Sequence, residues 1–308
     1  MVKKMKVAIS GFRGMIGQVV RKELEESGHE VVGLTRETLY DEKGVLLRSA
    51  LRGCAAVVHL AGAPVLQRWT ASARKEIMES RTVTTRHLVE AVNALLPGEK
   101  PALFLSASAI GIYRNGEVHD EQSLQYDTHF AAEVTQAWEK ASEGLDIHVR
   151  RVVFRIGLVL DAHSKLISLL WLPFRMGAGG PIGSGKQPFP FIHLNDLVRA
   201  MFWVLENRQA HGIYNLVAPE RITNRDFARQ FGALLHRPAL LPVPAFFMRL
   251  LYGTAAVMVL ESPAVHPARL MSEGFSFRYP SLQWALEEIV ARKKEKRPTS
   301  PGDTASSI

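Results

Sequence analysis

Short apolar runs alternate with amphipathic stretches along the first two-thirds of the chain. Thr70 is placed to cap an amphipathic helix that continues to Val92, and residues 18–26 form another such helix. Six apolar runs have the length of buried strands: residues 6–10, 30–36, 55–62, 103–108, 147–156 and 213–217. Strands that alternate with helices predict an α/β fold, in which a parallel sheet carries helices on both faces.

Three glycines separate the first predicted strand from the first helix, with the spacing G-x-x-G-x-x-G. Glycine permits a tight turn and a close approach of the backbone to a pyrophosphate, and the helix N-terminus offers free N–H groups to the anion. A tight turn without a ligand is the alternative, but the position between strand and helix favours a dinucleotide site. The predicted cofactor contacts in this loop are Gly11, Phe12, Arg13, Gly14, Met15, Ile16 and Gly17.

The second predicted strand ends at Thr35 and Arg36. An acidic residue here would bond the adenosine ribose of NAD(H), whereas arginine accommodates the 2′-phosphate of NADP(H). Arg13 supplies a second guanidinium, so we predict NADP(H) as the cofactor, with contacts from Thr35 and Arg36. A solvated strand end is the alternative reading of Arg36.

Small residues end the third predicted strand in the run His59-Leu60-Ala61-Gly62. Ligands of open α/β sheets bind at the carboxyl ends of the strands, and small residues let a cofactor lie flat there. We therefore predict that Leu60, Ala61 and Gly62 contact the cofactor. The fourth strand ends in the hydroxyl residues Ser106 and Ser108.

The order of these motifs resembles the extended short-chain dehydrogenase/reductase superfamily, and more narrowly an atypical, epimerase-like family. The resemblance covers nearly the whole chain except its tail. The further motifs that carry it are Ser80-Arg81, Trp138-Glu139, Arg155-Ile-Gly157, Leu172-Pro-Phe-Arg175, the run Gly179 to Gln187, Phe191 to Asp196, and Pro267-x-x-Leu270 with Gly274-Phe275.

This resemblance implies a Rossmann fold, a smaller C-terminal substrate domain, and NADP(H) as cofactor for substrates that are generally unassigned. It also implies cofactor contacts at Glu76 and Arg81, although five residues on a regular helix place these two about 140° apart. Ser106 and Leu158 complete the predicted cofactor contacts.

The chain departs from the superfamily at its catalytic pair. Ordinary members use Tyr-x-x-x-Lys, in which the lysine lowers the pKa of the tyrosine and the tyrosine transfers a proton. None of the six tyrosines here has a lysine four positions later. If Glu139 keeps its usual place, Ala131 and Thr135 occupy the tyrosine and lysine positions.

Three residues are candidates to replace the missing pair: Ser108, Tyr113 and Glu133. Ser108 matches the catalytic serine of the superfamily by strand position and could bond a carbonyl or a hydroxyl. Tyr113 is the nearest phenol, although a packing role also fits it. Glu133, and His129 beside it, can transfer protons in principle, although a histidine at a helix start is usually solvated.

The predicted domains are a Rossmann domain of residues 1–165, completed by 191–218, and a C-terminal domain of residues 166–190 and 219–292. A disordered basic tail is expected at 293–308.

Gly180 to Lys186 matches the start of a P-loop, but Gln187 replaces the Mg²⁺-binding hydroxyl and prolines follow, so we reject a nucleoside triphosphatase. Asp196 is expected to cap a helix.

Residues 245–260 are largely apolar, but the run is shorter than a membrane span and contains Arg249. We therefore expect a buried or partner-facing helix, with Phe246, Phe247, Met248 and Met258 in the core.

The chain has 308 residues, a net charge of +8 and one cysteine, Cys54, which excludes an internal disulfide. We read no secretory signal and expect a cytoplasmic protein that binds a small, anionic or sugar-nucleotide molecule, with no metal, nucleic acid or membrane. A homodimer is one assembly that the sequence allows. The leading function is an NADPH-dependent oxidoreductase or epimerase-like enzyme; the alternative is a non-catalytic NADPH sensor.

Overall fold

A computed structural model describes residues 4–295 of the chain. Its centre is a parallel sheet of six strands in the order β2-β1-β3-β4-β6-β9. These strands are β1 (Lys6–Ser10), β2 (Glu30–Leu34), β3 (Ala56–His59), β4 (Leu103–Ala109), β6 (Arg150–Ile156) and β9 (Gly212–Leu216). The predicted α/β fold with a parallel sheet is confirmed, although β2 ends two residues earlier than expected.

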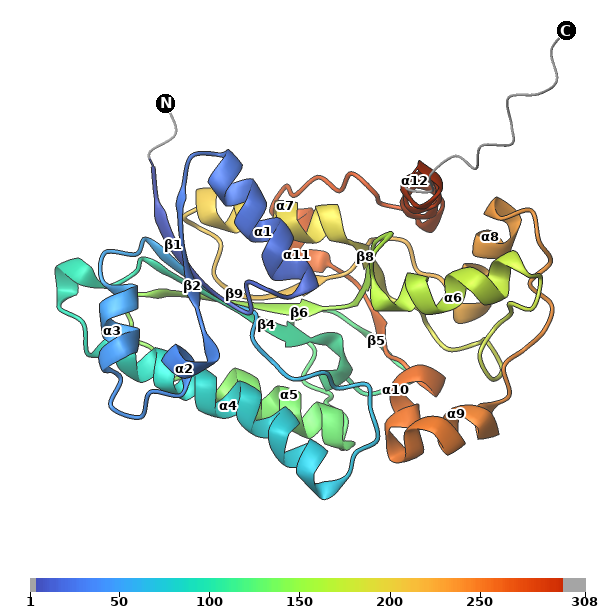
Figure 1. Ribbon diagram of the computed structural model, residues 1–308, viewed down its shortest axis with the longest axis horizontal. Helices are drawn as coiled ribbons and strands as arrows, with labels where there is room; N and C mark the ends of the chain where they lie inside the picture. The colour runs from blue at the N-terminus through green and yellow to red at the C-terminus, as the bar shows by residue number, and fades with distance from the viewer. Residues whose placement is uncertain (1–3, 296–308) are drawn as a thin grey trace, which may run out of the picture.

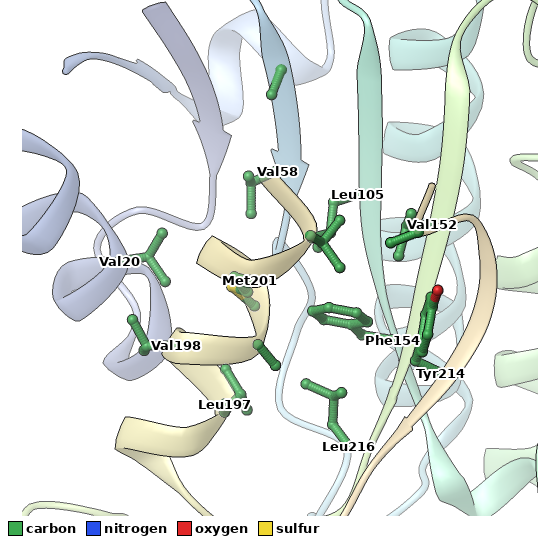
Figure 2. Packing of buried hydrophobic residues seen from close by; sticks show 14 of the residues in the cluster. Val20, Val58, Leu105, Val152, Phe154, Leu197, Val198, Met201, Tyr214 and Leu216 are labelled. Carbon is green, nitrogen blue, oxygen red and sulfur yellow. The ribbon is translucent and has the colours of Figure 1, made fainter. Parts of the chain in front are cut away.

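Helices cover both faces of this sheet (Figure 1). One face carries α1 (Met15–Glu26) and α7 (Leu194–Glu206), and the other carries α3 (Val45–Leu51), α4 (Ala71–Asn93) and α5 (Phe130–Lys140). Figure 2 shows the core on the first face, where Val20 of α1 and Met201 of α7 lie over Val58, Leu105 and Phe154 of the strands.

A second hydrophobic core lies beyond the carboxyl edge of the sheet. It is formed by α6 (Lys165–Arg175), α8 (Asn224–Leu234) and α12 (Leu282–Glu295), together with residues of the two-stranded sheet β7 (Leu158–Leu160) and β8 (Phe191–His193). The remaining elements are α2 (Arg36–Leu39), η1 (Pro97–Glu99), η2 (Ile110–Ile112), β5 (Val118–His119), α9 (Ala245–Tyr252), η3 (Gly253–Ala256), α10 (Val257–Leu260), β10 (Ala264–Val265) and α11 (Ala268–Ser272).

Two helices begin at threonine caps, and the cap at Thr70 was predicted from sequence. Thr70 accepts the N–H of Ala73 as the cap of α4, and Thr223 forms a reciprocal capping box with Asp226 at α8.

Asp196 does not cap α7, contrary to the expectation. The cap is His193, whose side chain accepts the N–H of Asn195. Asp196 is buried and accepts the N–H groups of Arg278 and Tyr279 at 2.8 and 2.7 Å, so it ties the C-terminal segment to α7.

The apolar segment 245–260 also differs from the expectation. It is broken at Gly253 into α9 and α10, and only Met248 of the four predicted core residues is buried. Phe246 is 68% exposed, and Phe247 and Met258 are exposed as well. Within residues 4–295, no helix combines the length and apolar character needed to cross a membrane.

The ordered C-terminal region extends beyond the predicted end of the domain at residue 292. Residues 293–295, assigned to the tail from sequence, form the last turn of α12, and residues 296–308 lie outside the described residues.

Candidate cofactor and substrate site

The glycine loop lies where the strand order reverses. The chain passes from β1 to β2 on one side and then returns to β3 on the other, and ligands of open α/β sheets bind at such a point. Gly11 (φ +70°) packs directly on the segment after β3, because a Cβ there would lie 2.8 Å from the carbonyl carbon of Leu60 and 2.9 Å from the amide nitrogen of Ala61. The two predicted cofactor segments are therefore side by side.

The first turn of α1 is left open for an anion. Gly14 is its N-cap and offers no side-chain acceptor to the N–H groups of the turn. A Cβ at Gly17 would lie 2.3 Å from the carbonyl oxygen of Gly11, so only glycine lets the helix start this close to the loop. Free N–H groups at a helix start bind phosphate readily. Met15 is exposed at this turn, while Ile16 packs on the main core.

A buried hydrogen-bond chain fixes the two segments to each other. Ser10 Oγ accepts the N–H groups of Leu60 (3.0 Å) and Ala61 (3.2 Å) and lies 2.6 Å from His59 Nδ1. His59 Nε2 lies 3.0 Å from Thr85 Oγ1 of α4. Since Ser10 then has one proton to give, we assign the proton of His59 to Nε2. Burial, with a smaller effect of Arg81, lowers the pKa of His59 to about 3 and keeps it neutral.

Arg81 is a buried cation beside this segment. It is 9% exposed, and a Cβ added to Gly62 would lie 2.9 Å from its Cζ. Its guanidinium lies 5.1 Å from the ring centroid of Trp138 and donates from Nη1 to the carbonyl of Ile77. Burial lowers its pKa to about 10. No carboxylate within residues 4–295 forms an ion pair with Arg81, so a bound phosphate would be its natural partner.

The glycine loop and β2 are in contact through Phe12 and Gly33, and Arg13 and Arg36 lie close to these two residues in the sequence. The ring of Phe12 packs on Gly33, where a Cβ would lie 2.9 Å from it, and Arg13 stacks over that ring at 5.2 Å. Arg36 opens α2 instead of ending β2, and Thr35 is the cap of that helix. Both guanidinium groups are exposed, and neither forms an ion pair in the described part of the chain.

A second polar cluster lies at the ends of β4 and β6. Glu139 of α5 accepts Arg155 Nε and Nη2, each at 2.8 Å, one on each carboxylate oxygen. Ser108 Oγ lies 2.5 Å from Glu139 Oε1. Burial alone would lower the pKa of Arg155, but its hydrogen bonds to Glu139 and the charge of that carboxylate outweigh this and raise it.

This pairing fixes the direction of the Ser108 hydrogen bond. A carboxylate held by two guanidinium donors can only accept, so Ser108 donates its proton to Glu139. Toward any other molecule, Ser108 can then offer only lone pairs. The Ser108 residue is 4% exposed.

Tyr113 is part of the support of this cluster. It is fully buried, donates to Asn215 Oδ1 at 2.8 Å, accepts Arg155 Nη1 at 2.8 Å and stacks on His119. Burial, partly opposed by Arg155, raises its pKa to about 12. The packing role that the sequence left open is therefore the one this geometry supports, because both hydrogen-bonding positions of the hydroxyl are occupied.

The structure does not bring Glu133 to Ser108. Ala131 and Thr135 face the buried side of α5, and Glu133, two residues from each, is exposed on the opposite side. His129 caps α5, with Nδ1 accepting the N–H of Ala132.

The remaining predicted contacts are divided between surface and interior. Glu76 is exposed on α4, about 1.4 turns from the buried Arg81. Ser106 is buried and donates to the carbonyl of Ala107, while Leu158 is 38% exposed at the start of β7. Ser10, Thr85, Glu139 and Arg155 were not predicted as functional residues. The available signal was the presence of Glu139 and Arg155 in the motifs Trp138-Glu139 and Arg155-Ile-Gly157, which carry the family resemblance.

This fold and this glycine loop define a Rossmann-type dinucleotide-binding protein of the extended short-chain dehydrogenase/reductase class. The NAD dependent epimerase/dehydratase family matches residues 7–216, and the chain belongs to that family. Residues 243–289 match a second family, a domain of unknown function designated DUF1731. The predicted epimerase-like resemblance is thus confirmed.

Known relatives match almost the whole chain. The mouse epimerase family protein SDR39U1 is 36% identical over 298 residues, which cover 93% of this chain and all of the relative. The crystal structure of human SDR39U1 with NADPH is 34% identical, has a TM-score of 0.86 and covers 93% of this chain and 99% of that one. The crystal structure of a nucleoside-diphosphate sugar epimerase from Corynebacterium glutamicum is 27% identical and has a TM-score of 0.74. The match covers 95% of this chain and 61% of that one. The cofactor predicted from sequence is the one in the human crystal structure.

Proposed function

We propose that this protein binds NADPH across the carboxyl edge of the sheet and is an oxidoreductase or epimerase-like enzyme. The observation that carries the proposal is Arg81, a buried guanidinium without an ion pair in the described residues, held beside Gly62 in the segment that packs on Gly11. A dinucleotide phosphate would supply the missing negative charge. The NADPH in the crystal structure of the human relative supports this choice.

The residues of the chain fit this cofactor in three places. The open first turn of α1 would receive the pyrophosphate, and Arg13 and Arg36 would receive the 2′-phosphate. Arg81 would approach the cofactor from α4. NADP(H), when bound, supplies or accepts the hydride.

Ser108 would hold the substrate group that reacts. Because its proton is committed to Glu139, it would accept a hydrogen bond from a substrate hydroxyl and would give none to a carbonyl. We therefore propose a small substrate with a hydroxyl at the reacting carbon, of the anionic or sugar-nucleotide kind. We further propose a cytoplasmic location, and homodimer formation as an assembly to test.

Single-turnover kinetics would test the enzyme. NADP⁺ reduction with a panel of sugar nucleotides and small secondary alcohols should be measurable, and Ser108→Ala should slow it while NADPH affinity stays unchanged. A positioned polar group of this kind contributes about 10²–10⁴-fold when it transfers the proton itself, so an orienting Ser108 should contribute less. A fast rate that Ser108→Ala retains would show that the reacting group lies elsewhere.

A specific observation also favours the second candidate, a non-catalytic NADPH sensor. If Glu139 keeps its usual place in the family, Ala131 and Thr135 replace the proton-transferring pair, and Ser108 is almost fully buried. A sensor would bind NADPH as tightly as an enzyme but show no turnover with either alcohols or carbonyls. That result would exclude the enzyme and leave the cofactor site standing.

A further inference from the structure

A basic cavity lies outside the site described above, between the end of α6, the turn after α8 and the last turns of α12. Its volume is about 290 Å³, at the lower limit of small-molecule pockets, which span about 300–1,000 Å³. Its lining residues are Trp171, Arg175, Leu235, His236, Arg237, Lys293 and Lys294.

The charge of this cavity is one-sided. Four of the seven lining residues are arginine or lysine, and none is acidic. Within residues 4–295, none of these four cations forms an ion pair with Asp or Glu. The nearby acids Asp161 and Glu288 are both bound by Arg292, one residue before Lys293.

Only two of the four cationic side chains donate hydrogen bonds to backbone carbonyls, within the described residues. Arg237 donates from Nε to the carbonyl of Arg175 (3.0 Å), and Lys293 donates to the carbonyl of Ala162 (2.8 Å). In the described part of the chain, the side chains of Arg175 and Lys294 make no hydrogen bond. Their donors are available to a ligand.

Helix dipoles do not neutralise this charge. The carboxyl ends of α6, α8 and α12 all lie here, and each contributes about −0.5 of an elementary charge, so the three offset about one and a half of the four positive charges. About two and a half positive charges remain around one small volume. A compact anion with more than one negative charge would match them.

We propose that this cavity is a binding site for a small multivalent anion of the phosphate-ester or diphosphate type. Arg175 and Lys294 bind the anion directly, and Arg237 fixes the end of α6 that carries Arg175. The indole of Trp171, over which Lys293 lies at 5.9 Å, forms one wall. The proposal is independent of the proposed function, because it shares no residue with the cofactor site.

Calorimetric titration with inorganic pyrophosphate tests the site directly. Saturating NADPH is present throughout, so that the glycine loop is occupied, and ionic strength is constant. We expect one pyrophosphate per chain. Arg175→Gln and Lys294→Gln should each weaken binding by about 2- to 5-fold, the range for partly exposed charge pairs.

Lys165→Gln is the matched control. Lys165 begins the same helix as Arg175, is exposed and lies outside the cavity, so its loss changes net charge equally. Binding that weakens in the two cavity variants but not in Lys165→Gln supports the site. Absence of pyrophosphate binding by the unaltered chain, or an equal loss in all three variants, would overturn it. Thermal denaturation of each variant verifies that the fold is intact.

Discussion

Burying the unpaired guanidinium of Arg81 should lower the stability of the cofactor-free protein and strengthen the binding of NADPH. Replacing Arg81 by methionine tests these two effects separately. Methionine keeps the length and apolar stem of the side chain but removes the charge. The pKa of Arg81 falls from 12.5 to about 10 through burial, which corresponds to a cost of about 3 kcal/mol for keeping the group charged. Since the pKa is lowered on folding, this cost is fully present at any pH below 10.

The interactions that Arg81 makes recover part of this cost. Its hydrogen bond to the carbonyl of Ile77 contributes about 1 kcal/mol, and its contact with the Trp138 ring about 1–2 kcal/mol. Arg81→Met should therefore leave the cofactor-free protein equally stable or more stable, by up to about 1 kcal/mol. Urea denaturation measures this difference.

NADPH binding should respond in the opposite direction. A hydrogen bond to a charged group contributes about 1.5–3 kcal/mol, so the loss of Arg81 should weaken NADPH binding by about 10- to 150-fold. Fluorescence titration gives the affinity, and Arg86→Met is the control, because Arg86 is exposed on the same helix. Unchanged NADPH affinity in Arg81→Met, or a loss of stability above about 2 kcal/mol, would refute the reasoning.

Three further changes test other parts of the structure. Arg36→Ala should weaken NADPH binding but leave NADH binding unchanged, because only NADPH carries the 2′-phosphate; parallel titrations decide, and equal effects would contradict the assignment. Glu139→Gln should destabilise the fold by about 3–5 kcal/mol, because Arg155 loses its buried ionic partner; Glu133→Gln, on the exposed face of α5, should cost less than about 0.5 kcal/mol in the same denaturation experiment. His236→Gly should stabilise the protein by about 0.5–1 kcal/mol, because His236 (φ +53°) holds a left-handed conformation; a lower melting temperature would count against this.

Local patterns in the sequence were sufficient to predict the parallel sheet and the glycine loop after its first strand. Buried parallel strands leave unbroken apolar runs, and the closeness of Gly11 and Gly17 to neighbouring backbone permits no other residue. Capping is also local, so Thr70 could be recognised as a helix cap from its immediate neighbours.

Contacts between distant segments left no comparable pattern. Ser10 bonds His59 from 49 residues away, and Asp196 bonds the backbone of residues 82 and 83 positions later. A composition rule also failed at α9, where an apolar run was assigned to the core. Phe246 and Leu250 are more than 60% exposed there, because hydrophobicity alone does not say which face of a short helix is covered.

Within residues 4–295, the missing tyrosine–lysine pair and the hydrogen bond from Ser108 to Glu139 both leave the site without a proton donor for a substrate carbonyl. A tyrosine with a lowered pKa can give a proton to a carbonyl or take one from an alcohol, so such a site serves both reactions. Here Ser108, at the end of β4, donates the proton of its hydroxyl to Glu139, and the ion pair with Arg155 keeps Glu139 a carboxylate that can only accept. A carbonyl oxygen at Ser108 would gain no hydrogen bond, whereas a hydroxyl would gain one. Under the proposed function, an alcohol should therefore bind this site more tightly than the corresponding carbonyl compound.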